Sequence, residues 1–459
     1  MSLRHAALWL WLTPSLWCHA QWISLNGGLS HAARSFALSA DGTRLLVGGS
    51  FPYLNDGAVR ANNLAWWDGQ NWSLDGLANG SGDTSEFGND FPVLSTTIRQ
   101  DTLFLSMLYD SWQQDQEMGF ATMLVDGEWE PCGSPEGIFF FLEANGRLFG
   151  GGQYSYLNGG EAYGVQEWRG GWHSIPNMPF TEGVVQVWDV EYWHGQYYFG
   201  GAFAYAGCQK VVAFDGVDQW SPLAQGVGGS WVATLAGFGD SLYAGGYMLP
   251  GPNVQSRHLQ IWDGTQWLPF FDEVTVFGKT VDMKVHDDAL WISGLFLFGD
   301  DPTYRGLIRF DGTSICAFGG AMSQGGGWFD FFNEDLYMGL PPTNEQLYYE
   351  HIGYLDLATV EPDTCLLVNP SSTGMRAKGN VELRVYPNPA QDQITLELPA
   401  HWTGPVLIEL SNGVGQLLFS RIINNNTGHL PLEPLGKGIY SIRVKHGGET
   451  SSARVVVTN

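Results

Sequence analysis

Short apolar runs separated by glycine-rich turns recur along most of the chain, and helical periodicity is hard to find. Four runs end in a Gly-Gly pair: LLVGGSF (45–51), LFGGGQY (148–154), YYFGGAF (197–203) and LYAGGYM (242–248). Two weaker copies are WISGLF (291–296) and LYMGL (336–340). Apolar runs of this length that are bounded by turns are typical of β-strands. The pattern therefore predicts an all-β protein.

A second feature follows the glycine pairs at a regular distance. It is an aromatic residue beside a turn, usually Asp-Gly, and then a closing Trp four to six residues later, as in Phe214 with Trp220. At Trp168 and Trp172 the turn is Arg-Gly-Gly, and after Phe310 a cysteine replaces the Trp. The closing positions are 72, 129, 172, 220, 267 and 316. Repeats near 50 residues with four strands each predict the blades of a β-propeller.

The number of blades follows from how the repeat begins and ends. Six units are complete or nearly so, and a seventh starts at Leu336 but has no closing Trp. The segment QWISLNGGLS (21–30) matches QWSPLAQGVG (219–228), so we expect it to supply the outer strand of the seventh blade. Pairing the two chain ends removes the exposed edge of an open ring. Seven blades are predicted, with six or eight as alternatives because residues 73–102 are irregular.

Each repeated residue type has a physical reason. Gly-Gly lets backbones approach closely near the crowded axis and tolerates unusual dihedral angles at the strand end. Asp-Gly suits a primed hairpin turn, which needs positive φ. Large aromatic side chains are expected to fill the space between neighbouring blades.

The glycine pair with its spaced aromatic and Trp resembles kelch repeats and the related galactose-oxidase-like propellers. The resemblance covers residues 21–365. It implies a fold and no particular activity, because such propellers include enzymes and binding platforms.

The end of the chain has a different pattern. Residues 366–380 have the Pro, Ser, Gly and Asn content of a linker. Residues 381–459 contain about seven runs of alternating apolar and polar residues. In one of them Ile394, Leu396 and Leu398 point one way, opposite Thr395 and Glu397. This alternation predicts a small antiparallel β-sandwich of the immunoglobulin-like kind.

Three motifs in this last region support a closer match. They are Tyr386-Pro387-Asn388-Pro389, Gly438-Ile439-Tyr440 and a terminal run ending in Val455-Val456-Val457. Together they resemble the type IX secretion C-terminal sorting domain. The resemblance implies a Gram-negative source, passage through the periplasm and an outer-membrane translocon, and removal of the tail. The protein would then be released or attached to surface lipopolysaccharide. An ordinary immunoglobulin-like domain is the alternative.

The first 20 residues are read as a secretory signal peptide that is cut between Ala20 and Gln21. A membrane anchor needs about 20 apolar residues, and Thr13-Pro14 interrupts this run. A lipoprotein signal would have small residues before Cys18, where Trp17 stands. No other transmembrane segment is expected. The chain is predicted to be secreted or held at the outer cell surface.

Four cysteines remain after that cleavage: Cys132, Cys208, Cys316 and Cys365. Four cysteines allow three pairings. Cys316 and Cys365 could pair, because they bracket the last repeat and are expected on neighbouring blades. Buried unpaired thiols are the alternative.

Charge divides the chain in the same place as the repeat. The net charge is −26, and residues 21–375 hold 12 Lys and Arg against 41 Asp and Glu. Residues 376–459 hold 8 against 6. An acidic body repels nucleic acid, so no nucleic-acid partner is expected.

We name no catalytic, cofactor-binding or metal residue. The repeated Asp-Gly carboxylates, which are Asp68, Asp126, Asp215, Asp263 and Asp311, are expected to be turn residues. The histidines 173, 194, 258, 286 and 351 fall in different units, which argues against a metal centre of the galactose-oxidase kind.

Six tryptophans exceed what the repeat requires: Trp66, Trp112, Trp188, Trp193, Trp231 and Trp328. We expect one or two of them to line a sugar-stacking surface and the others to pack blades. Two functions follow: a non-catalytic module that binds a glycan or protein, or a secreted carbohydrate-active hydrolase or lyase with its site in the central funnel. Three or more converging carboxylates or histidines would indicate the enzyme. Gly, Ser and aromatic residues would indicate the binding module.

Overall fold

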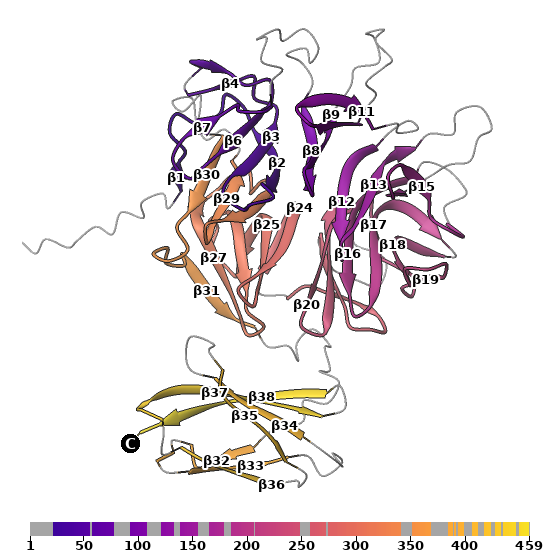
Figure 1. Ribbon diagram of the computed structural model, residues 1–459. Helices are drawn as coiled ribbons and strands as arrows, with labels where there is room; N and C mark the ends of the chain where they lie inside the picture. Colours follow the sequence, from indigo (N-terminus) through magenta and orange to yellow (C-terminus); the bar gives the residue numbers. More distant parts are fainter. Residues whose placement is uncertain are drawn as a thin grey trace, which may run out of the picture. The chain divides into compact units, whose positions relative to one another are not determined.

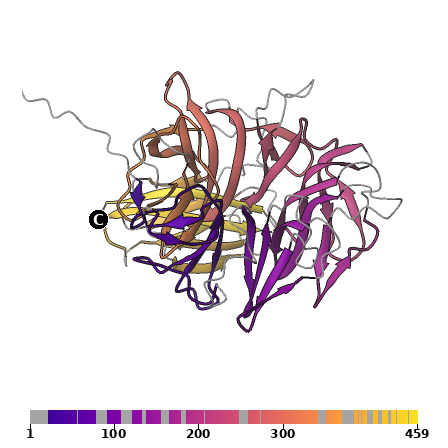
Figure 2. The same cartoon turned by 90° about the horizontal axis from the view of Figure 1, so that it is seen from above.

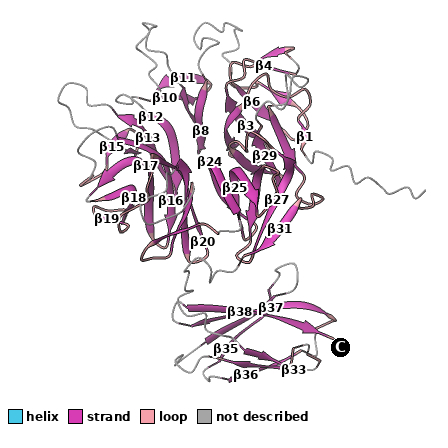
Figure 3. Ribbon diagram, turned by 180° about the vertical axis from the view of Figure 1, so that it is seen from behind, coloured by secondary structure: helices cyan, strands magenta, loops and turns pink. Residues whose placement is uncertain are grey.

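The structure is a computed structural model, and every element that it describes is a strand or a turn (Figure 3). The described residues are 22–55, 57–77, 92–107, 121–132, 138–154, 165–178, 185–205, 207–247, 258–271, 274–340, 351–368, 384–388, 390–391, 393–398, 406–411, 417–423, 427–432, 435–446 and 449–458. The chain divides into two compact units, residues 1–373 and 374–459, which are treated separately. No helix in the described part could span a membrane.

The first unit is a ring of antiparallel sheets, which we number as blades 1 to 7 (Figures 1 and 2). Blade 1 consists of β2 (Ala33–Leu38), β3 (Leu45–Gly49), β6 (Leu64–Trp67) and β7 (Trp72–Ser73). A separate hairpin, β4 (Tyr53–Leu54) and β5 (Val59–Arg60), follows β3. Blade 2 consists of β8 (Val93–Arg99), β9 (Thr102–Met107), β10 (Ala121–Val125) and β11 (Glu128–Pro131).

Blades 3 to 5 repeat the same order of strands. Blade 3 consists of β12 (Ile138–Ala144), β13 (Arg147–Tyr154), β14 (Val165–Trp168) and β15 (Trp172–Ser174). Blade 4 consists of β16 (Val185–Trp193), β17 (Gln196–Tyr205), β18 (Cys208–Phe214) and β19 (Trp220–Pro222). Blade 5 consists of β20 (Trp231–Phe238), β21 (Ser241–Tyr247), β22 (Leu259–Trp262) and β23 (Trp267–Pro269).

Blades 6 and 7 complete the ring. Blade 6 consists of β24 (Val274–His286), β25 (Ala289–Phe298), β26 (Arg305–Phe310), β27 (Ser314–Ala321) and a fifth strand, β31 (Thr364–Leu367). Blade 7 consists of β28 (Phe329–Phe332), β29 (Asp335–Gly339), β30 (Ile352–Leu355) and β1 (Ile23–Ser24). The predicted seven-bladed, all-β propeller is therefore confirmed.

The ring closes by pairing its two ends, as the repeat predicted. In blade 7, Ile23 pairs with Tyr354 and Ser24 with Gly353. The colours in Figure 2 run once around the ring, so the last blade lies beside the first. Strands that are far apart in the sequence thus share one sheet, and the ring has no open junction between first and last blades.

The glycine pairs allow close packing around the axis. A Cβ on Gly48 would lie 2.6 Å from the Val93 side chain of the next blade, and one on Gly49 would lie 2.3 Å from the Ala32 carbonyl oxygen. Gly200 and Gly201 repeat this arrangement against Val232 and the Gln186 carbonyl. The close approach expected of these pairs is confirmed. Neither pair has positive φ, so the expected dihedral role is absent at these four glycines.

Four closing tryptophans join their blade to the blade before it, whereas the indole nitrogen of the fifth, Trp172, has no hydrogen-bond partner. Four indole N–H groups donate to backbone carbonyls 44 to 52 residues earlier: Trp72 to Leu25 (3.0 Å), Trp129 to Leu77 (3.3 Å), Trp220 to Pro176 (2.9 Å) and Trp267 to Leu223 (3.2 Å). Each indole also packs against an aromatic residue or an apolar cluster of its blade, as Trp220 does on Phe214 at 4.5 Å. The predicted inter-blade role of these aromatics therefore includes a hydrogen bond.

The Asp-Gly pairs lie in turns, as expected, but only one fits the primed geometry. Asp126 and Gly127 both have positive φ, of 51° and 85°. At the other four turns only the glycine is positive, and the aspartate carboxylate holds the turn. Asp263, for example, accepts the amide N–H groups of Thr265 and Gln266, both at 2.8 Å.

Cys316 and Cys365 form a disulfide. We expected the two cysteines on neighbouring blades, and this was wrong. Both lie in blade 6, because β31 returns and pairs with β27 as the outer edge of that blade. The two residues face each other across this strand pair. Cys132 and Cys208 are buried and unpaired.

The second unit contains all seven predicted strands. One sheet has β32 (Arg384–Tyr386), β33 (Gln393–Glu397) and β36 (Thr427–Pro431). The other has β34 (Val406–Ser411), β35 (Leu417–Ile423), β37 (Gly438–His446) and β38 (Glu449–Val457). Buried side chains from both sheets, including Ile394, Ile408 and Ile442, form one apolar cluster.

Candidate functional site

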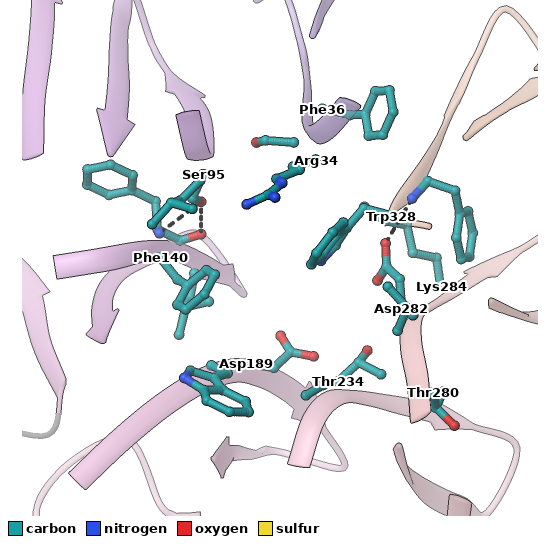
Figure 4. Close-up of a pocket in the computed structure, with 18 of the residues that line it drawn as sticks. Arg34, Phe36, Ser95, Phe140, Asp189, Thr234, Thr280, Asp282, Lys284 and Trp328 are labelled. Carbon is teal, nitrogen blue, oxygen red and sulfur yellow. Dashed lines mark hydrogen bonds between the residues drawn. The ribbon is translucent and has the colours of Figure 1, made fainter. Parts of the chain in front are cut away.

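A cavity of about 370 Å³ occupies the centre of the propeller (Figure 4). Its lining comes from the first strand of every blade or the residues beside it, which makes β2, β8, β12, β16, β20, β24 and β28 the inner strands. The first residues of successive inner strands lie between 43 and 60 residues apart in sequence. The site therefore exists only when the whole ring has closed.

One equivalent residue from each blade forms a ring around this cavity. Each lies on the inner strand or, for Trp328, directly before it, opposite the first glycine of the pair or its replacement, as Ser35 lies opposite Gly48. The seven members are Ser35, Ser95, Phe140, Asp189, Thr234, Asp282 and Trp328. We call this set the axial ring. Five members are polar and two are aromatic.

All five polar members of the axial ring accept a backbone N–H from the inner strand of the next blade. The donors are Thr96 to Ser35 (2.7 Å), Phe141 to Ser95 (3.1 Å), Leu235 to Asp189 (2.6 Å), Met283 to Thr234 (3.1 Å) and Phe329 to Asp282 (3.2 Å). In each case the donor is the residue that directly follows the axial-ring member of the next blade. These side chains therefore fasten five of the seven blades to the next blade at the axis.

Each oxygen of the two carboxylates of the axial ring accepts one backbone amide N–H. Asp189 also accepts the N–H of Val190 (2.7 Å), and Asp282 that of Met283 (2.9 Å). Desolvation by the surrounding protein raises the pKa of Asp189 to about 6 and also raises the pKa of Asp282. Two carboxylates and no histidine occur among the described lining residues, fewer than the three that would indicate an enzyme.

Two further charged residues lie on the inner strands, each two residues after a carboxylate of the axial ring: Lys284 after Asp282, and Glu191 after Asp189. Lys284 is 2.9 Å from Asp330, and although burial opposes its charged form, Asp330 and Asp282 hold its pKa above the usual value. Desolvation, followed by the charge of Asp189, raises the pKa of Glu191 to about 7. Lys284 is thus neutralised by its acidic neighbours.

The end of the cavity at which the inner strands begin, which we call the mouth, is aromatic and basic. Trp231 begins β20, Trp328 directly precedes β28, and Trp188 lies on β16 next to Asp189. The rings of Trp188 and Trp231 meet edge to face at 5.2 Å. Lys279 lies 5.8 Å from the Trp328 ring. Figure 4 shows the Arg34 guanidinium pointing into the cavity, with Asp189 on another wall.

The surplus tryptophans divide between packing and this mouth. Trp66 is buried in an apolar cluster of blades 1 and 2, and Trp193 packs against the cluster of blades 4 and 5. Trp112 lies outside the described residues. Trp188, Trp231 and Trp328 all line the cavity, one more than the largest number expected. Arg34 and Lys279 carried no sequence signal, because neither belongs to the repeat pattern.

The structure also brings one histidine together with two carboxylates. His286, Asp287 and Glu334 offer ligand atoms that all lie within 4.8 Å of one another. Both acids sit in hairpin turns at the far end of the inner strands, and the His286 ring stacks on Phe331 at 3.9 Å. The other histidines named from the sequence do not join this cluster.

The predicted sorting motifs converge in the second unit. Gly438 pairs with Val457 across β37 and β38, and Ala390, just after the first motif, forms a bridge to the same Val457. Tyr386 is exposed at the end of β32, and Tyr440 donates its hydroxyl to the Gly436 carbonyl at 2.8 Å. The first motif, the second motif and the chain end thus lie together, although Pro389 is outside the described residues.

Residues 384–458 match the family model of the secretion system C-terminal sorting domain. The chain therefore carries a type IX sorting domain, which marks a protein for secretion or for the cell surface. The residues of the predicted signal cleavage, Ala20 and Gln21, are outside the described part.

Other comparisons add little about function. No curated protein matches the chain. The extracellular domain of a candidate one component system, BT4673 from B. thetaiotaomicron, is 12% identical with a TM-score of 0.35, and the alignment covers 96% of this chain and 59% of that one. Dimeric latent PorU from Porphyromonas gingivalis is 9% identical with a TM-score of 0.14, with 78% and 31% covered.

Proposed function

We propose that the propeller is a non-catalytic module that binds a glycan outside the cell. The observation that carries the proposal is the mouth, where three tryptophans surround a cavity of about 370 Å³. Flat aromatic faces beside a few polar groups suit the apolar face of a sugar ring. The repeat itself is of the kelch-like kind in this proposal, used as a platform.

The axial ring favours binding over catalysis. A general acid or base must reach the substrate within hydrogen-bond distance. In Asp189 and Asp282 each carboxylate already accepts two backbone amides, one of them from the next blade. Their first task is to hold the ring together.

A secreted hydrolase or lyase is the second candidate, and one observation favours it. The pKa of Asp189 is raised to about 6 and that of Glu191 to about 7. Raised carboxyl pKa values are what glycosidases use for general acids. Turnover of a polysaccharide that is lost in Glu191→Gln would support this candidate over the first.

Trp328 provides the direct test of glycan binding. Its side chain is 37% exposed, so Trp328→Ala should leave the fold intact. We expect up to about a tenfold loss of affinity for any glycan found by array screening, since aromatic stacking contributes about 0.5–1.5 kcal/mol beyond burial and about 1.4 kcal/mol is tenfold. Tyr192→Ala, also 37% exposed but outside the cavity lining, is the matched control. Equal binding by both variants and the parent would contradict the proposal.

For export, we infer that a signal peptide ending at Ala20 leads the chain into the periplasm of a Gram-negative cell. Residues 381–459 then address it to the type IX translocon, are removed, and leave the propeller released or attached to the surface. In this scheme residues 21–365 form the propeller and 366–380 a linker. A chain lacking residues 381–459 should accumulate in the periplasm, as cell fractionation would show. Appearance of that truncated chain in the medium would contradict the scheme.

A further inference from the structure

Arg34 stands out among the cations of the propeller. It is the second residue of β2, and its guanidinium points into the central cavity (Figure 4). Within the described part of the chain it has no ion pair and no hydrogen bond. Lys284, the other cation deep in this cavity, is held by Asp330 at 2.9 Å. Of these two deep cations, Arg34 is therefore the one that is left for a ligand.

The surroundings make an unpaired arginine unexpected. Residues 21–375 hold 41 acidic side chains against 12 basic ones, so a carboxylate partner could easily have been placed there. The carboxylates that do line the cavity are held elsewhere, Asp189 by Val190 and Leu235. Arginine cannot lose its proton at ordinary pH, so it keeps its charge in the cavity.

The second cation lies on the same aromatic surface. Lys279 is exposed and sits 5.8 Å from the Trp328 ring, and both residues line the cavity with Arg34. An aromatic platform with cations beside it can stack the ring of a sugar and bind its acidic substituent at the same time. A cavity of about 370 Å³ is small for a ligand site, since such pockets span about 300–1,000 Å³. It suits one or two sugar units.

We infer that the mouth recognises an anionic sugar, whose carboxylate or sulfate is bound by the Arg34 guanidinium while a sugar ring stacks on Trp328. The inference rests on the proposed glycan-binding function and adds the chemical class of the ligand. The planar fork of arginine binds either oxyanion through two parallel hydrogen bonds, which lysine cannot reproduce. Lys279 adds a second positive charge at the rim.

The test uses the full chain, which still carries residues 381–459, and three oligosaccharides of equal length: one neutral, one containing uronic acid and one sulfated. Isothermal titration calorimetry should give at least tenfold tighter binding of one or both acidic sugars than of the neutral one. Which of the two binds identifies the source of the oxyanion. Raising the salt concentration should weaken the binding of the acidic sugar and leave the binding of the neutral sugar unchanged.

Variants then locate the contact. Arg34→Gln should abolish the preference for the acidic sugar, and Arg34→Lys should restore part of it. Arg421→Gln, an exposed arginine of the second unit, makes the same change in net charge and should have no effect. An unchanged melting temperature of Arg34→Gln confirms that the fold is intact.

The outcomes separate this inference from the proposed function. If the neutral sugar binds as tightly as the acidic ones, or if Arg34→Gln binds the acidic sugar like the parent, the inference of an anionic ligand is wrong. The proposed glycan binding then still holds. If none of the three sugars binds, and array screening finds no other glycan, both are wrong.

Discussion

The propeller and the C-terminal unit use the same element, the short antiparallel strand, but place their functional residues differently. The cavity of the propeller is built from seven inner strands spread over residues 33–332. The sorting motifs lie within residues 386–457, where Gly438 and Ala390 both meet Val457. A cavity made by ring closure leaves no linear motif, whereas the sorting domain does.

The two units also differ in how they are held together. The C-terminal unit has one continuous apolar cluster between two sheets. The propeller has several clusters between blades and adds polar and covalent fasteners: the axial ring, the tryptophan N–H groups and a disulfide. Changes to these fasteners should therefore weaken one unit and leave the other intact, which calorimetry can resolve as two transitions.

The largest effect is expected from removing the disulfide. Cys316 and Cys365 are 49 residues apart, and closing a loop of that size stabilises by about 4 kcal/mol through the entropy of the unfolded chain. Replacing both with alanine should lower the free energy of unfolding of the propeller by that amount and move its calorimetric transition to a lower temperature. The C-terminal transition should not move, since no cysteine follows Cys365. A shift of both transitions would mean that the units unfold together.

A smaller effect is expected at the glycine pair of blade 4. A Cβ on Gly201 would clash with the Gln186 carbonyl oxygen, so Gly201→Ala should cost roughly 3 kcal/mol by forcing the strands apart. Gly436→Ala in the second unit meets nothing within 4 Å and is the matched control. If Gly201→Ala left the melting temperature of the propeller as unchanged as Gly436→Ala does, the packing role assigned to the glycine pair would be refuted.

The smallest effect concerns pH. Desolvation and the charge of Asp189 raise the pKa of Glu191 to about 7 in the folded state. In the unfolded state this carboxyl has its ordinary pKa of 4.5, so between these two pH values only the folded state keeps the proton. The stability from this group is present at pH 4.5 and is lost as pH rises through 7. We expect a loss of about 1 kcal/mol, since the Glu191 side chain is only partly buried and solvent screens it. Urea unfolding at pH 5 and pH 8 measures it. Glu191→Gln should reduce the difference between the two pH values by that amount, and the remainder includes Asp189 and Asp282, whose pKa values are raised as well.

Several features could be predicted because they depend on neighbours in sequence. Strand length, turn position and the repeat of about 50 residues follow from local patterns such as Asp263-Gly264 and the closing Trp267. Matching the segment at Trp22 to that at Trp220 predicted the ring closure that Ile23 and Tyr354 make. The place of β31 could not be predicted in this way, because Thr364–Leu367 carries no turn or repeat that says which blade it joins.

The sequence by itself determined the fold class, the number of blades and the sorting domain, since each is written in short-range pattern. Only the tertiary structure decided which residues meet at the axis. Ser35, Asp189 and Asp282 became fasteners, Trp188, Trp231 and Trp328 became one surface, and Arg34 was left facing the cavity. The reason is geometric: each blade contributes only a few residues to the axis, and those residues are neighbours only after the ring has closed.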